Sequence, residues 1–162
     1  MKVLITGADG FIGKNLSFAF EQIGVETFRF GRTDNKSTLK LALSEVDWVF
    51  HLAGVNRPKD KEEFQISNVQ LTEELCSILQ TNNKKIPIVF TSSSQVALNN
   101  DYSLSKLKAE KALQDLSVHN GNRIFIYRLP NVFGKWARPN YNSVVATFCF
   151  NTVKGLPIKI NN

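Results

Sequence analysis

Residues 2–13 read KVLITGADGFIG, a short apolar run followed at once by three glycines, Gly7, Gly10 and Gly13. Residues 2–6 carry β-branched and apolar side chains without alternation, which predicts a strand buried on both faces. After the glycines, apolar residues recur with the spacing of a helix. The stretch therefore predicts a strand, a tight glycine turn and a helix in direct succession.

The same alternation continues along the chain. The further predicted strands are residues 25–30, 46–54, 86–93 and 123–129, with a last short strand at 156–160. The further predicted helices are residues 39–45, 61–81, 103–118 and 143–154. Strands that alternate with helices and are apolar throughout indicate an α/β fold, a Rossmann-like doubly wound parallel sheet with helices on both faces. We expect one domain over residues 1–162, the N-terminal fragment of a longer enzyme.

Composition excludes several classes of protein. Apolar residues make up 43% of the chain, which is enough for a sizeable core and argues against disorder. No apolar run approaches the roughly 18 residues of a membrane span, and the N-terminus has no signal-peptide pattern, so we expect a cytoplasmic protein. The net charge is +6, but the basic residues are dispersed, so no nucleic-acid partner is expected. Cys76 and Cys149 stand in apolar stretches and are expected to be reduced core thiols, and no metal site is expected.

The glycine turn at the first strand–helix junction predicts a dinucleotide site. Glycine permits a tight turn and lets the backbone approach a pyrophosphate closely. The helix N-terminus adds unpaired N–H groups and a favourable dipole. The alternative is an ordinary glycine turn.

The end of the second strand bears on the choice of cofactor. An NAD site usually places an acidic residue there to bind the ribose hydroxyls. Residues 28–33 read FRFGRT, with no acidic residue before Asp34 and with Arg32 in the loop. A guanidinium can bind a 2′-phosphate with paired hydrogen bonds, so we expect NADPH rather than NADH. The alternative is that Arg32 is solvated and the selection is loose.

A tyrosine and a lysine stand four residues apart in YSLSK, as Tyr102 and Lys106. This spacing places both on one helical face, where the ammonium would lower the pKa of the phenol and suit it to general acid–base catalysis. The segment TSSSQV at 91–96 ends a predicted strand at the edge where parallel sheets bind ligands. For YSLSK, the alternative is a Tyr and a Lys that merely lie on the surface. For TSSSQV, the alternative is a strand end that is polar without binding a ligand.

In combination these motifs resemble the extended short-chain dehydrogenase/reductase family, in particular its nucleotide-sugar members. The matching segments are GADGFIG, HLAG at 51–54, TSSSQV, YSLSK and RLPNVFG at 128–134. Residues 134–152 also resemble the CapF-type enzymes of capsular polysaccharide synthesis. Those enzymes carry a reductase domain followed by a cupin epimerase domain, which implies that this chain stops before the substrate-binding lobe.

The resemblance implies roles for individual residues. Tyr102 would be the catalytic acid/base, with Lys106 as its pKa partner and ligand of the nicotinamide ribose. Ser93 would assist it, with Ser94 close to the substrate. Asn131 would contact the substrate. Asn68 would hold the site residues in place without touching the substrate itself. The residues implied at the cofactor are Gly7, Gly10, Phe11, Ile12 and Gly13 at the pyrophosphate, and Leu52, Ala53 and Gly54 on the adenosine side.

Two departures from the family pattern affect the expected reaction. The stretch between Ser93 and Tyr102 is much shorter than in most nucleotide-sugar relatives. Dehydratases of the family follow their hydroxyl residue with Asp-Glu, and here Ser94 and Gln95 stand in those places. Neither is a workable general acid or base, so a dehydratase is disfavoured.

The resemblance implies an NADPH-dependent reductase that acts on a UDP-linked 4-keto-6-deoxy-hexosamine in the synthesis of UDP-N-acetyl-L-fucosamine, a capsule precursor. One alternative is a nucleotide-sugar 4-epimerase with bound NAD, against which Arg32 argues. A second is a non-catalytic NADPH-binding regulator of the same fold. The expected partner is a UDP-sugar substrate, and the family is compatible with a homodimer.

Overall fold

The chain forms two compact units, Met1–Leu129 and Pro130–Asn162. The computed structural model describes residues 1–58, 60 and 62–160. One domain over residues 1–162 stays a prediction.

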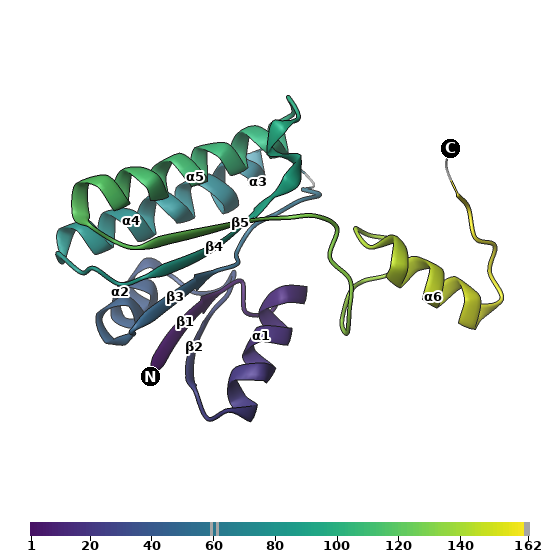
Figure 1. Cartoon of the computed structure of the whole chain (residues 1–162), viewed down its shortest axis with the longest axis horizontal. Coiled ribbons are helices and arrows are strands. Elements are labelled where there is room, and N and C mark those ends of the chain that lie inside the picture. The colour runs from purple at the N-terminus through teal and green to yellow at the C-terminus, as the bar shows by residue number, and fades with distance from the viewer. Residues whose placement is uncertain (59, 61, 161–162) are drawn as a thin grey trace. The chain divides into compact units, whose positions relative to one another are not determined.

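The first unit is built on a parallel sheet. Its strands are β1 (Lys2–Thr6), β2 (Glu26–Phe30), β3 (Trp48–His51), β4 (Ile88–Ser93) and β5 (Ile124–Leu129). They pair in the order β2-β1-β3-β4-β5, and every pair is parallel (Figure 1). The order reverses beside β1, and ligands of open parallel sheets bind at the carboxyl ends of the strands at such a point. The predicted α/β, Rossmann-like fold is confirmed.

Helices connect the strands. They are α1 (Phe11–Gln22), α2 (Lys36–Glu45), α3 (Glu62–Phe64), a π-helical segment η1 (Gln65–Gln70), α4 (Leu71–Thr81), a 3₁₀ turn η2 (Ser94–Ala97) and α5 (Asp101–Asn120). The α2 and α5 N-termini are capped by Asn35 and Asn100, whose side chains accept hydrogen bonds from backbone N–H groups in the first turn. Figure 1 shows α4 and α5 side by side along one face of the sheet.

The helix expected over residues 61–81 is one helical stretch with a change of winding. Residue 61 lies outside the described residues, and α3 begins at Glu62. Six residues of π-helix then lead into α4. Apolar periodicity located the stretch but did not reveal the π segment, because such segments are rare and follow from packing at a functional site more than from residue type.

Two groups of apolar side chains hold the sheet to its helices. The larger group fills the space between the sheet and α2, α4 and α5, and includes Leu4, Val49 and Ile88. The smaller group contains Val3 and Ile5, with partly buried α1 side chains packed against it. Side chains of a strand alternate between the two faces, so neighbours on β1 serve opposite groups. Full burial of one such side chain contributes roughly 1.5–3 kcal/mol.

The second unit contains α6 (Val144–Lys154), capped by Ser143 at its start and ended by Gly155 with φ +64°. The strand expected at 156–160 is wrong, since the described residues there form no strand. The backbone N–H of Leu156 and the carbonyl of Pro157 both hydrogen-bond to Asn151, so this segment closes the end of α6 instead of joining a sheet.

Two further observations concern composition. Cys76 is buried as expected, but Cys149 is exposed, because α6 has no buried residue within its unit. Among the described residues, no helix is both long and apolar enough to cross a membrane.

Candidate functional site

The three glycines form a turn in which two of them, Gly7 and Gly13, are packed too closely for any side chain. Gly7 has φ +68°, and its N–H donates to the carbonyl of Phe30 at 2.8 Å. A Cβ on Gly7 would lie 2.8 Å from the backbone of Ala53, and one on Gly13 would lie 2.2 Å from the carbonyl oxygen of Gly7. Gly10 precedes α1 in an extended conformation. The turn thus places bare backbone at the carboxyl end of β1, as the sequence predicted.

Helix α1 begins directly after this turn, with Phe11 and Ile12 as its first residues. Its first N–H groups have no partner within the helix, which suits them to an anionic ligand. A cleft of about 800 Å³ opens beside the turn. Leu52, Ala53 and Gly54 line this cleft, and their contact with a cofactor stays a prediction.

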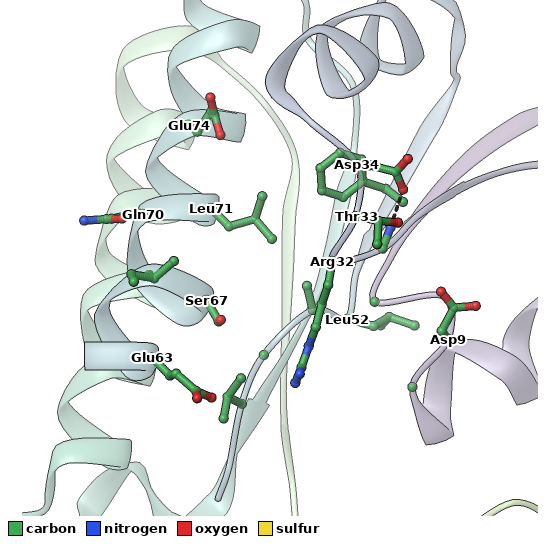
Figure 2. A pocket seen from close by; sticks show the side chains of 18 of the residues that line it. Asp9, Arg32, Thr33, Asp34, Leu52, Glu63, Ser67, Gln70, Leu71 and Glu74 are labelled. Atoms are coloured by element: carbon green, nitrogen blue, oxygen red, sulfur yellow. Dashed lines mark hydrogen bonds between the residues drawn. The ribbon is translucent and has the colours of Figure 1, made fainter. Parts of the chain in front are cut away.

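Charged side chains gather where the cleft meets the end of β2. Figure 2 shows the Arg32 side chain extending into the cleft beside Leu52. Asp34 lies next to it and accepts a hydrogen bond from the N–H of Gly31 at 2.8 Å. Arg32 therefore extends into the cleft with a carboxylate in the same loop, and its contact with a phosphate stays a prediction.

A second carboxylate at this end of the cleft is already paired. Arg29 donates to Asp9 Oδ1 at 2.7 Å and to the carbonyl of Ala8 at 3.3 Å. These bonds tether the glycine turn to β2. The sequence analysis did not identify this ion pair, since only the fold brings the two residues together.

The tyrosine of YSLSK lies in the first turn of α5, and Ser93 ends β4. Tyr102 and Ser93 lie close enough together for the serine hydroxyl to lower the pKa of the phenol. Burial raises the pKa of Tyr102, and the effect of Ser93 opposes that rise only in part. The expected lowering of this pKa is wrong for the structure, because desolvation of the phenolate outweighs the favourable contacts. Ser94 follows Ser93 but is exposed.

Lys106 is buried, and its ammonium donates to the carbonyl of Thr91 at 2.9 Å and lies 4.9 Å from the centre of the Phe90 ring. Burial lowers the pKa of Lys106 to about 8, and the charge of Glu110 opposes this. The ammonium is thus held at the end of β4, one turn of α5 below Tyr102.

A buried carboxylate, Glu110, ties α5 to the sheet. It receives hydrogen bonds from Ser92 on β4 and from two nitrogens of Arg128 on β5, at 3.1 and 2.7 Å. Burial alone would raise the pKa of Glu110, but these bonds hold it below its ordinary value. The pair fixes α5, and with it the tyrosine and the lysine, against the strand that ends in Ser93.

The predicted ordering role of Asn68 has a geometric basis. Its side chain exchanges two hydrogen bonds with the backbone of Val55, at 2.7 and 3.0 Å, and donates to Ser105 at 2.9 Å. Asn68 lies in the π-helical segment. One amide therefore links the segment after β3 to the helix that carries the tyrosine.

One predicted residue, Asn131, belongs to the second unit, and its contact with the substrate stays a prediction. The fold also draws attention to residues that the sequence analysis gave no role. His51, Glu110 and Arg128 were not singled out for a role, although His51 begins the HLAG motif and Glu110 follows Lys106 by four residues. Among the described residues, no group of three or more His, Cys, Asp or Glu side chains is arranged to hold a metal ion.

Comparison with known proteins agrees with this geometry. Residues 3–162 match the model of the "NAD dependent epimerase/dehydratase family". The chain is 51% identical to the UDP-2-acetamido-2,6-beta-L-arabino-hexul-4-ose reductase of Pseudomonas aeruginosa, over all of this chain and 44% of that protein. The crystal structure of the capsular polysaccharide assembling protein CapF from Staphylococcus aureus superposes with a TM-score of 0.86 at 42% identity, again over all of this chain and 44% of that one.

The fold is shared more widely. A UDP-glucuronic acid 4-epimerase from Bacillus cereus in complex with NAD superposes with a TM-score of 0.84 at 20% identity, over 99% of this chain and 66% of that one. At this identity the likeness concerns the fold alone. The chain thus spans less than half the length of the relatives that resemble it most in sequence among those named here.

Proposed function

Since this chain belongs to the NAD dependent epimerase/dehydratase family, we propose that it is the NADPH-binding, catalytic part of a nucleotide-sugar reductase. Its substrate would be a UDP-linked 4-keto-6-deoxy-hexosamine on the route to UDP-N-acetyl-L-fucosamine, a capsule precursor. The names of its P. aeruginosa and S. aureus relatives support this choice.

The observation that carries the proposal is the proximity of Tyr102, in the first turn of α5, to Ser93, the last residue of β4. Because burial raises the pKa of Tyr102, the phenol keeps its proton at neutral pH. It can then donate that proton to a carbonyl oxygen that is being reduced. Ser93 would bind the same oxygen and orient it toward the phenol.

NADPH would supply the hydride when bound. The residues fit a dinucleotide, since Gly7 and Gly13 exclude side chains from the turn and α1 begins beside it. Arg32 would bind the 2′-phosphate, and Lys106 would bind the ribose next to the nicotinamide. The ammonium of Lys106 would also stabilise the negative charge left on Tyr102 after proton transfer.

One observation favours a second candidate, a 4-epimerase that keeps NAD bound. Asp34 and Arg32 both line the cleft just after β2, and an acidic group at this place in the fold suits the free ribose hydroxyls of NAD. The two candidates differ in the fate of the cofactor, because a reductase consumes NADPH and an epimerase regenerates its NAD.

The test combines binding and turnover. Calorimetry with NADPH and NADH should show tighter binding of NADPH, and Arg32→Met should remove the preference. NADPH absorbance would then be followed with a UDP-linked 4-keto-6-deoxy sugar. Tyr102→Phe should abolish NADPH consumption with little change in NADPH affinity. Tyr127→Phe is the matched control, since Tyr127 is 54% exposed on β5.

Three outcomes would contradict the proposal. Unchanged turnover in Tyr102→Phe would refute the role of the phenol. A preference for NADH, with cofactor recovered unchanged after reaction, would favour the epimerase. NADPH binding that alters a partner interaction, without consumption of any keto sugar, would favour a regulator.

A further inference from the structure

The histidine of the HLAG motif is fully buried at the end of β3, between the glycine turn and the π segment. His51 Nδ1 lies 2.7 Å from the hydroxyl of Thr6, and Nε2 lies 2.9 Å from the hydroxyl of Thr72. Thr6 ends β1, and Thr72 is in the first turn of α4. The mechanism proposed above gives none of these three side chains a role.

The directions of these hydrogen bonds follow from counting protons. The hydroxyl of Thr72 donates to the carbonyl of Asn68 at 2.8 Å, because a carbonyl oxygen can only accept. That hydroxyl has no second proton, so it accepts from His51, and Nε2 must carry a hydrogen. The hydroxyl of Thr6 accepts from the N–H of Ala53 at 3.2 Å and keeps its own proton to donate to Nδ1. Every group is satisfied only with the Nε2–H tautomer.

The opposite tautomer would leave a defect. With the hydrogen on Nδ1, the unprotonated Nε2 would face the hydroxyl oxygen of Thr72. The hydroxyl proton of Thr72 would still point to the carbonyl of Asn68, so no hydrogen would lie between the two atoms. The alternative is to turn that proton toward Nε2, which leaves the carbonyl of Asn68 without this bond. A buried group that loses its partner is costly, so the environment selects one protonation state of His51.

The surroundings also disfavour the imidazolium. His51 is buried, and burial together with the nearby charge of Lys106 lowers its pKa to about 3. The Phe90 ring stacks on the imidazole, and the ammonium of Lys106 lies over that ring. The groups described here reach His51 from β1, β4, α4 and α5, and Lys106 is the charged one among them.

The chain of bonds continues to the proposed catalytic residue. The side chain of Asn68 donates to the hydroxyl of Ser105, which in turn donates to the backbone carbonyl of Tyr102 at 2.7 Å. At the other end, the N–H of Ala53 belongs to the wall of the cleft. In this chain of hydrogen bonds, His51 therefore lies between Ala53, which lines the cleft, and the first turn of α5, which carries Tyr102.

We propose that His51, fixed as the neutral Nε2–H tautomer, is a positioning residue. It holds residues 52–54, which line the cleft, in a fixed position relative to the π segment and to Tyr102 on α5. The inference rests on the proposed function for the identity of the ligand, NADPH. The tautomer itself is independent of that function.

Nitrogen-15 NMR of the whole chain tests the tautomer directly, because the chain contains only two histidines. His119 is the internal control. It is exposed, and its Nδ1 lies 2.8 Å from the carbonyl of Asp115, so its neutral form carries the hydrogen on Nδ1. Above the ordinary histidine pKa of about 6.5, the two rings should show opposite tautomers. A protonated Nδ1 on His51, in either a neutral or a cationic ring, would overturn the proposal.

Thr72→Val tests the positioning role with little change in shape. It should weaken NADPH binding by roughly fivefold or more, because His51 and the carbonyl of Asn68 both lose a partner. Thr81→Val is the matched control, since the Thr81 hydroxyl also donates to a carbonyl four residues earlier, that of Ser77, but at the exposed end of the same helix. It should leave the affinity unchanged.

Thermal unfolding identifies the temperature at which both variants are folded, and affinities are compared there. The His51 Nε2 resonance should shift in Thr72→Val and stay in place in Thr81→Val. A folded Thr72→Val chain with wild-type affinity would refute the positioning role, leaving a structural one. A wild-type chain that bound no NADPH would instead refute the proposed function, and the ring resonances would still decide the tautomer.

Discussion

Gly7 and Gly24 permit a matched test of the glycine turn, because both have φ +68° but their surroundings differ. A Cβ on Gly24 would meet nothing within 4 Å. A Cβ on Gly7 would lie 2.8 Å from the N and Cα of Ala53. Replacing each glycine with alanine therefore places the new residue at the same positive φ, while only one replacement also forces two backbone segments apart.

The expected magnitudes differ accordingly. A left-handed conformation costs an alanine roughly 1–2 kcal/mol, and alanine recovers part of this by restricting the unfolded chain. We therefore expect Gly24→Ala to reduce the free energy of unfolding by about 1 kcal/mol. Gly7→Ala adds the cost of overpacking, typically about 1–3 kcal/mol, so we expect a loss of about 2–4 kcal/mol.

Urea denaturation at neutral pH, followed by circular dichroism, measures both losses by linear extrapolation. Calorimetry with NADPH supplies a second readout. Gly24→Ala should retain wild-type affinity, and any folded Gly7→Ala should lose it, because the cleft wall moves. Equal losses of stability in the two variants, within about 0.5 kcal/mol, would refute the steric argument. So would full NADPH affinity in Gly7→Ala.

Arg128→Met should lower the urea midpoint at neutral pH, since it leaves the buried carboxylate of Glu110 without its guanidinium. The pKa of Glu110 is lowered in the folded chain, so the pair stabilises above the unfolded pKa of about 4.3 and ceases to do so as pH falls through the folded value. The difference between wild type and variant should accordingly shrink in acid, and a constant difference would contradict the assignment. Burial raises the pKa of Cys76 to about 12, so iodoacetamide should label Cys149 at least about tenfold faster in the native chain, as read by mass spectrometry. Equal rates would disprove this. Arg29→Met should reduce NADPH affinity several-fold by releasing the glycine turn, yet change stability by no more than about 1 kcal/mol, because the ion pair is exposed. Unchanged affinity in calorimetry would count against the tether.

The glycine turn and the parallel sheet were predictable because their causes are local. A tight turn needs glycine, and a strand buried on both faces needs continuous apolar residues. The strand wrongly expected at 156–160 has the same apolar character. Whether such a stretch becomes a strand depends on a neighbouring strand, and here Asn151 engages its backbone instead.

Electrostatic properties were harder to anticipate. The spacing of Tyr102 and Lys106 was read correctly as one turn of a helix, but the sign of the tyrosine's pKa shift depends on burial, which sequence spacing does not report. The same holds for Cys149, whose apolar neighbours gave no sign of its exposure. The hydrogen bonds of His51 join residues that lie 45 and 21 positions apart, so only the fold could bring them together.

The π-helical segment has a consequence for how this protein can tolerate change. An α-helix advances about 100° per residue, and a π turn holds one residue more than an α turn. Gln65–Gln70 thus takes up one residue more than an α-helix would need to lead from α3 into α4, whose Leu75 and Leu79 are fully buried in the core. Deleting a single residue there would permit an unbroken α-helix in which α3 and those leucines keep their directions. The winding at Asn68 would change, however, and with it the bonds of its amide to Val55 and Ser105, so a more regular helix would be less well anchored to its neighbours.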